Sequence, residues 1–296
     1  MNNLALSKSD SSSLAQYFEL CKPNVVSLIV FTAIVGMLLS TEGTIAINLL
    51  VFGSIGIALG SAAGAAINHV IDQKIDTVMD RTMARPIPTG AISTRNALIF
   101  AAMLAISSMV ILSTLVNLLT AFLTFLSMIG YAFIYTVYLK RTTPHNIVLG
   151  GAAGATPPLL GWCAMTGTVT IEAILLFVII FIWTPPHFWP LAIKRQDDYR
   201  RAGLPMLPVT HGVAFTKQQI LLYTFLLFAV TLLPYSIAMS GLLYLASAIV
   251  LGLGFIYHAI KLYRSEGDVH TMQTFGYSIV YLFGLFAALL ADHYLL

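Results

Sequence analysis

Long apolar segments alternate with short polar clusters along almost the whole chain. Nine of these segments have the roughly 17 to 25 residues that a helix needs to cross a bilayer. Each run is continuously apolar and lacks the two-residue alternation of a membrane β-barrel, so the pattern predicts transmembrane helices. The predicted spans are 24–41, 47–67, 96–113, 118–139, 146–165, 171–191, 219–238, 242–263 and 273–292.

Composition supports the same fold class. Of the 296 residues, 58% are hydrophobic and 9% are charged, whereas a soluble domain has about 25% charged residues. The sequence therefore predicts an all-α polytopic membrane protein whose main partner is the lipid bilayer. The net charge of +3, without a basic stripe interleaved with aromatic residues, excludes a typical nucleic-acid-binding protein.

The basic residues predict the orientation of the chain. All 15 Lys and Arg residues lie in the N-terminal segment, in the even-numbered connections, or at the span ends beside them. The connections near 42–46, 114–117, 166–170 and 239–241 hold none. The positive-inside rule then places the N-terminus in the cytoplasm and, after nine spans, the C-terminus outside. We expect a multi-pass protein of the cell (inner) membrane.

The polar segments divide the chain into a tail and one transmembrane domain. Residues 1–15 are Ser-rich and polar, which predicts a disordered cytoplasmic tail before a single domain over 16–296. Two cytoplasmic loops are long, about 68–95 and 192–218. Each loop carries acidic residues followed by prolines and a glycine. The loops follow the second and the sixth predicted spans, so they are four helices apart. This weak internal repeat predicts two related halves that face each other.

One row of polar residues carries candidate chemistry. Asn68, Asp72 and Asp76 recur every fourth residue directly after the second apolar run, and Asp80 follows one step later. On a helix this spacing returns to nearly the same face, so the side chains form a stripe of oxygen atoms. Mg²⁺ prefers such hard oxygen ligands and commonly accompanies substrate phosphates. The stripe predicts a Mg²⁺ site at the membrane boundary, where carboxylates are costly unless they have a function.

The first loop, NHVIDQKIDTVMDRTMARPIPTG from Asn68, resembles the first signature of the UbiA-type intramembrane prenyltransferases. The resemblance implies a UbiA-type helical bundle in which Asn68, Asp72 and Asp76 bind Mg²⁺, which holds the diphosphate of an isoprenoid donor. Basic side chains on the same side of the membrane are candidates to bind the diphosphate. Aromatic rings on that side are candidates to shelter the allylic cation. The basic candidates are Lys74, Arg81, Arg85, Lys140 and Arg141. The first three of them, together with Asn68, Asp72 and Asp76, are the candidate catalytic residues. The aromatic candidates are Tyr131, Phe133, Tyr135 and Tyr138.

The second loop, PPHFWPLAIKRQDDYRRAGLPMLPVTHG from Pro185, narrows the resemblance. Its carboxylates are Asp197 and Asp198, whereas many UbiA-type enzymes have an Asp at the positions of Arg195 and Tyr199. The loop resembles that of the branch that farnesylates protoheme IX. The resemblance implies transfer of a farnesyl group from farnesyl diphosphate to the vinyl group of haem B, with water addition. Asp197 and Asp198 are candidates for a second Mg²⁺ or for pairing with basic side chains of the first loop.

Haem as a substrate requires its own contacts. His187, where a proline-rich span enters the second loop, is the first candidate iron ligand, and His211 is the second. A downstream haem-handling enzyme or terminal oxidase is an expected partner. Two alternatives stay open: a prenyltransferase acting on an aromatic quinone precursor, and an ion-coupled transporter. The transporter is disfavoured because the acidic residues lie at span ends and not near the midplane.

Overall fold

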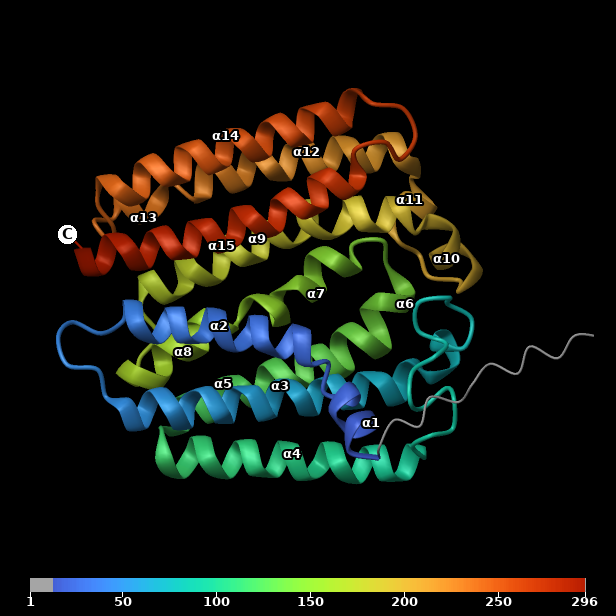
Figure 1. Ribbon diagram of the computed structural model, residues 1–296, viewed down its shortest axis with the longest axis horizontal. Helices are drawn as coiled ribbons and strands as arrows, with labels where there is room; N and C mark the ends of the chain where they lie inside the picture. Colours follow the sequence, from blue (N-terminus) through green and yellow to red (C-terminus); the bar gives the residue numbers. More distant parts are fainter. Residues whose placement is uncertain (1–12, 296) are drawn as a thin grey trace, which may run out of the picture.

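The structure is a computed structural model that describes residues 13–295, and within that range every regular element is helical (Figure 1). Eight helices are long and apolar enough to cross a membrane. A ninth span is obtained if the bent pair α1 (Ser13–Leu20) and α2 (Pro23–Leu39), which meet at 51°, counts as one. The all-helical membrane fold is thus confirmed. Residues 1–12 of the predicted tail lie outside the described residues, and the remainder of that tail begins α1.

The first half of the bundle is built around α3 (Ile47–Asp76), which packs along α4 (Thr94–Leu115). Helix α3 has 30 residues and continues to Asp76, well beyond the predicted span end, so the first long loop starts later than expected. The fourth span combines α5 (Leu118–Ile129), the π-helix η1 (Gly130–Leu139) and the single turn α6 (Lys140–Thr142). Its wider π turns change which side chains share a face.

The fifth span is divided into α7 (Asn146–Ala155) and α8 (Pro157–Thr166). Proline cannot donate the backbone hydrogen bond that would join the two pieces smoothly, and Pro157 begins the second piece. Small residues allow α8 to lie against α2: a Cβ at Gly161 would be 1.9 Å from the Ala33 carbonyl oxygen. Gly161 therefore serves close helix packing, as expected for glycines in membrane helices.

The second half contains α9 (Ile171–Lys194), α12 (Gly212–Val230), α14 (Leu242–Arg264) and α15 (Thr271–Leu295), with the short α13 (Leu233–Ser236) after α12. These helices pack around a core of buried aliphatic and aromatic side chains. Three prolines lie inside α9, yet the helix is continuous to its last residue. In Figure 1, α12 and α14 lie above α7, and α3 and α4 lie below it.

The two long connections lie at one end of the bundle (Figure 1). One follows α3, and the other contains α10 (Gln196–Arg201) and α11 (Leu207–Thr210). The C-terminus is at the opposite end. The residues that carry the candidate chemistry are therefore gathered at one end of the helices.

Candidate active site

Three polar side chains of α3 form the stripe that the spacing predicted. Asn68, Asp72 and Asp76 occupy the last turns of α3 and are 4%, 2% and 2% exposed. The Asn68 amide nitrogen donates a hydrogen bond of 2.9 Å to Asp72 Oδ2 and one of 3.1 Å to the Thr136 hydroxyl. The helix thus holds two carboxylates and one amide in a buried row, where they need compensating charge.

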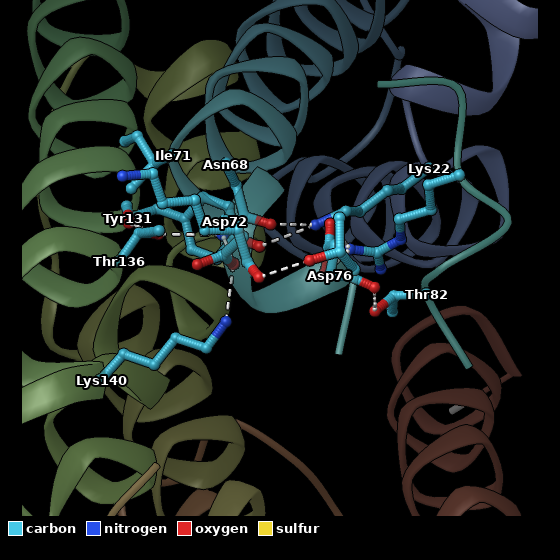
Figure 2. Close-up of polar contacts among 12 residues, drawn as sticks. Lys22, Asn68, Ile71, Asp72, Asp76, Thr82, Tyr131, Thr136 and Lys140 are labelled. Carbon is cyan, nitrogen blue, oxygen red and sulfur yellow. Dashed lines mark hydrogen bonds and ion pairs between the residues drawn. The ribbon is translucent and has the colours of Figure 1, made fainter. Parts of the chain in front are cut away.

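Three basic residues from different parts of the chain surround the stripe, two of which, Lys22 and Lys140, are labelled in Figure 2. Lys140 lies 2.6 Å from Asp72 Oδ2, and Arg85 Nη1 lies 2.8 Å and 2.9 Å from the two oxygens of Asp76. Lys22 donates to Asn68 Oδ1 and lies 3.4 Å from the Tyr131 hydroxyl. Lys22 and Lys140 approach the stripe from opposite sides. Negative and positive groups are thereby placed together at one buried point.

One oxygen of the stripe is left without a partner. Asp72 Oδ1 is buried and has no hydrogen bond. Among residues 13–295, no three acidic, imidazole or thiol groups come close enough to hold a metal ion by themselves. A divalent ion at this site would use the Asn68 amide oxygen together with the two carboxylates. Such an oxygen set fits Mg²⁺, which usually keeps part of its water shell and binds substrate phosphate oxygens as well.

An apolar cavity of about 320 Å³ begins beside the stripe. Lys22 and Tyr131, which both contact the stripe network, are part of its wall. Apart from a few hydroxyl groups, the remainder of the wall is mostly apolar. On α9 the wall runs from Phe188 to Ile180, which corresponds to roughly 12 Å of helix. The cavity therefore has a polar, cationic mouth and an apolar interior.

The predicted aromatic residues do not all reach this cavity. Tyr131 and Tyr135 line it, with ring centroids 5.8 Å apart in a stacked arrangement. Tyr138 is 64% exposed and Phe133 is 50% exposed, and neither lines the cavity. On a regular α-helix Tyr138 would share a face with Tyr131, seven residues earlier. The π-helical turns of η1 rotate it away.

Several predicted residues of the first loop also lie away from the stripe. Lys74 is exposed and points from nearly the opposite side of α3 to Asp72, because it is two residues after Asp72. Arg81 is exposed as well. Helix α3 ends at Asp76, so Asp80 is out of helical register and pairs at 2.8 Å with Arg201 of α10. Arg141 donates a hydrogen bond of 3.1 Å to the Ile71 carbonyl oxygen beside the stripe.

The carboxylates of the second loop are held by arginines. Asp198 pairs with Arg201 and, at 3.6 Å, with Arg195, while Asp197 pairs with Arg200 at 2.7 Å and is 84% exposed. Arg201 thereby joins Asp198 to Asp80, so the two long connections are linked by one shared cation. The prediction paired acidic residues of the second loop with basic residues of the first loop. In the structure the pairing is reversed, because acidic Asp80 of the first loop meets basic Arg201 of the second.

Tyr199 follows Asp198 on α10 and belongs to a cluster of buried apolar side chains. It is buried, and burial raises the pKa of its hydroxyl above the ordinary value, so this group is protonated at neutral pH. Its ring lies 6.5 Å from that of Phe188, which lines the cavity. Where many related loops carry an Asp, this chain therefore places an uncharged aromatic residue.

His187 lies on α9 between two aromatic rings. Its ring stacks on Trp183 at 4.1 Å and on Phe275 at 4.7 Å, and its Nδ1 is 2.7 Å from the Ser278 hydroxyl. Ser278 donates its own proton to the Phe275 carbonyl oxygen at 2.6 Å. In the tautomer with its proton on Nδ1, His187 donates to the Ser278 oxygen and keeps the Nε2 lone pair for another partner.

His211 lies farther out on the second loop. It is exposed, forms a 2.8 Å hydrogen bond with Thr210, and stacks on Phe215 at 5.3 Å. Unlike Trp183, none of these neighbours lines the cavity. The structure therefore brings His187, but not His211, next to the cavity wall.

Sequence reasoning missed two residues of the site. Lys22 precedes α2 and is 46 residues from Asn68 along the chain, while Thr136 lies on η1. In the sequence, Lys22 is evidence only for the orientation of the chain in the membrane. One signal pointed to it: it is the sole cation at the start of the first span, directly before Pro23.

Comparisons with known proteins identify the family of the chain. The sequence matches the UbiA prenyltransferase family over residues 29–290. The chain belongs to the UbiA prenyltransferase family. A protoheme IX farnesyltransferase from Thioalkalivibrio sulfidiphilus is 60% identical over 292 residues, which are 99% of this chain and 97% of that protein.

Solved structures share the UbiA fold with this family member. A structure of digeranylgeranylglyceryl phosphate synthase matches with a TM-score of 0.81 at 20% identity, covering 96% of this chain and 99% of that one. A UbiA homologue from Archaeoglobus fulgidus, bound to DMAPP and Mg²⁺, matches with a TM-score of 0.66 at 17% identity over 93% of this chain and 99% of that one. At these identities the likeness establishes the fold.

Proposed function

We propose that this UbiA-family protein transfers the farnesyl group of farnesyl diphosphate to the vinyl group of haem B. Addition of water completes the product, haem O, and diphosphate leaves. A relative that is 60% identical over nearly the whole chain carries the name protoheme IX farnesyltransferase. The observation that carries the chemistry is the oxygen stripe with three cations at the mouth of an apolar cavity.

The stripe is the proposed seat of the diphosphate. Asn68, Asp72 and Asp76 would hold Mg²⁺, which neutralises charge on a leaving diphosphate. The unpartnered Asp72 Oδ1 is available for this purpose. The structure of the A. fulgidus homologue contains DMAPP, a prenyl diphosphate, together with Mg²⁺. Asp80, Asp197 and Asp198 stand in ion pairs with arginines and are not included in this proposed seat.

The cations would bind the phosphate oxygens. Lys22, Lys140 and Arg85 already surround the stripe, so binding of an anion requires only a change of partner by flexible side chains. Charge-assisted hydrogen bonds to such oxygens are shorter and stronger than neutral ones. The bond between the allylic carbon and the diphosphate then loosens at the cavity mouth, while the rings of Tyr131 and Tyr135 face the developing cation.

Haem B is proposed to bind beside His187. The hydrogen bond to Ser278 fixes the ring and leaves Nε2 as the candidate iron ligand. His211 is the second candidate. We further propose that the site faces the cytoplasm in the inner membrane, because the basic residues gather at this end. Passage of the product to a downstream haem-handling enzyme or terminal oxidase would follow from its chemistry.

A single assay tests the reaction. The purified protein is incubated with haem B, Mg²⁺ and farnesyl diphosphate, and the extracted haem is weighed by mass spectrometry. We expect haem to gain the mass of one farnesyl group and one hydroxyl group, the remaining proton of the water leaving with diphosphate. We expect a chelator to stop the gain until Mg²⁺ is restored. Undiminished turnover in the presence of the chelator would refute the metal proposal. Prenylation of an aromatic quinone precursor while haem stays unmodified would refute haem B as the acceptor.

Replacing Lys22 by Gln is expected to weaken farnesyl diphosphate binding by about 10- to 100-fold, because a hydrogen bond to a charged group contributes about 1.5 to 3 kcal/mol. Haem affinity is expected to stay the same. Isothermal titration with each substrate measures both affinities. Lys194→Gln is the matched control, since Lys194 is an exposed lysine at the same end and pairs with Asp268. Equal diphosphate affinity in Lys22→Gln and wild type would remove Lys22 from the site.

Replacing His187 by Phe is expected to lower haem affinity by about tenfold or more while farnesyl diphosphate affinity is retained. Phe preserves the stack with Trp183 and Phe275 but has no nitrogen for iron. Haem titration followed by the Soret band measures both affinity and ligation. Ser278→Ala should give a smaller loss, because it removes only the hydrogen bond that orients the ring. An unchanged Soret band in His187→Phe would contradict the ligand assignment.

A further inference from the structure

A second pocket, of about 390 Å³, lies where α14 ends and α15 begins. It is lined by Tyr257, Ile260, Lys261, Arg264, Ser265 and His270, none of which lines the central cavity. The connection beside it is tied to the end of α9 by the Lys194–Asp268 ion pair of 2.7 Å. The pocket is therefore at the same end of the bundle as the oxygen stripe but belongs to a separate surface.

The α14 residues of this pocket form one stripe with an ordered change in polarity. Tyr257, Ile260, Lys261 and Arg264 follow the spacing i, i+3, i+4 and i+7, which places them on a single helix face. The apolar and aromatic members lie deeper in the span, and the two cations lie in the last turn. Tyr257 is 62% exposed. A ligand matching this face has an apolar body directed into the membrane and a negative group at the interface.

The cations of the pocket are available to a ligand. Among residues 13–295, Arg85, Lys140, Lys194, Arg195, Arg200 and Arg201 are in ion pairs, whereas Lys261 and Arg264 are in none. Glu266, two residues after Arg264, is in none of these pairs either. Lys217 from α12 donates to the Ser265 carbonyl oxygen at 2.8 Å and to its hydroxyl at 3.2 Å, which adds a third basic side chain beside the pocket.

The backbone at the pocket edge is strained. His270 has a φ of 69°, in the left-handed region that residues other than glycine rarely adopt. Its side chain is fixed by a 2.9 Å hydrogen bond between Nδ1 and Gln273. Local strain of this kind persists where surrounding contacts enforce it, and it is concentrated at binding sites. His270 directly precedes α15 and lines the pocket together with the two cations of α14.

We propose that this pocket binds the phosphate headgroup of an anionic membrane phospholipid. Lys261 and Arg264 contact the phosphate, the Ser265 hydroxyl accompanies them, and Tyr257 with Ile260 lies along the glycerol and upper acyl chain. Basic pockets between transmembrane helices are suited to such headgroups, and Tyr is favoured at the membrane interface. A free phosphate would use the same cations but would leave Tyr257 and Ile260, the apolar part of this α14 face, uncovered.

The test uses the full-length protein in phosphatidylcholine nanodiscs that contain a small fraction of phosphatidylglycerol. Lipid that stays bound through exchange into detergent is counted by native mass spectrometry. We expect retained phosphatidylglycerol in the wild type, a loss of about fivefold in affinity for Lys261→Gln or Arg264→Gln, and roughly 25-fold for the double variant. Arg95→Gln, which removes an exposed arginine from α4, should bind as the wild type does.

Competition distinguishes the two sources of phosphate. If the lipid is the ligand, millimolar inorganic phosphate or glycerol phosphate leaves phosphatidylglycerol in place. Displacement by either soluble anion would overturn the lipid assignment in favour of a free phosphate. Equal retention of phosphatidylcholine and phosphatidylglycerol, or an unchanged double variant with a wild-type melting temperature, would overturn the site itself.

Discussion

Asp72→Asn and Asp76→Asn are each expected to lower the rate of prenyl transfer by about 10²- to 10³-fold, the typical cost of removing one group that stabilises charge in a transition state. Both carboxylates are 2% exposed and lie in one row with Asn68. Asn keeps the shape but contributes a neutral, weaker oxygen ligand. The rate is measured as farnesylated haem formed per minute by purified protein at saturating Mg²⁺.

A loss of folding must be separated from a loss of chemistry in this experiment. Removal of the Asp72 charge leaves Lys140 without its partner, and an unpaired buried charge costs about 3 to 5 kcal/mol. The double variant Asp72→Asn/Lys140→Gln removes that unpaired charge, so its melting temperature should recover while transfer stays lost. Asp268→Asn, at an exposed carboxylate paired with Lys194, should leave transfer unchanged. Normal turnover by both single variants would refute the assignment of the stripe.

Gly154→Leu is expected to shorten the isoprenoid that the protein accepts. Gly154 lines the central cavity, and a Cβ there would meet no atom within 4 Å, so the first carbon of a larger side chain has room at this position. One methylene more or less in an apolar pocket changes specificity by about 10- to 200-fold. We therefore expect the ratio of kcat/KM for farnesyl over geranyl diphosphate to fall by at least about tenfold.

The control for this change is Gly276→Leu. Gly276 lies on α15, also has no atom within 4 Å of a built Cβ, and does not line the cavity. The Gly276→Leu substitution adds the same side chain to a membrane helix. It should leave the ratio of kcat/KM for farnesyl over geranyl diphosphate unaltered. If Gly154→Leu behaves like Gly276→Leu, the isoprenoid chain does not pass Gly154. Neighbouring Gly151 is unsuitable for the experiment, because its Cβ would lie 2.9 Å from Thr184.

Only part of the proposed site followed from the sequence. Asn68, Asp72 and Asp76 share a face because four-residue spacing within one helix is a local property. The partners of these residues are 46, 68 and 9 positions away for Lys22, Lys140 and Arg85. Nothing in local spacing selected those three cations over Lys74 or Arg81. Likewise, Tyr138 matched the α-helical period of Tyr131, and only the π-helical turns of η1 moved it off the cavity wall.

By itself, the sequence determined the all-helical membrane class, most span positions, the oxygen stripe and the family. These depend on apolar length and on spacing within single helices, because a bilayer forces each segment to satisfy its own backbone hydrogen bonds. The tertiary structure alone decided which cations meet the stripe, that Arg201 links Asp80 to Asp198, and that His187 Nδ1 meets the Ser278 hydroxyl. Those features depend on how distant helices pack, because buried charges and ring nitrogens take their partners from whichever element lies alongside.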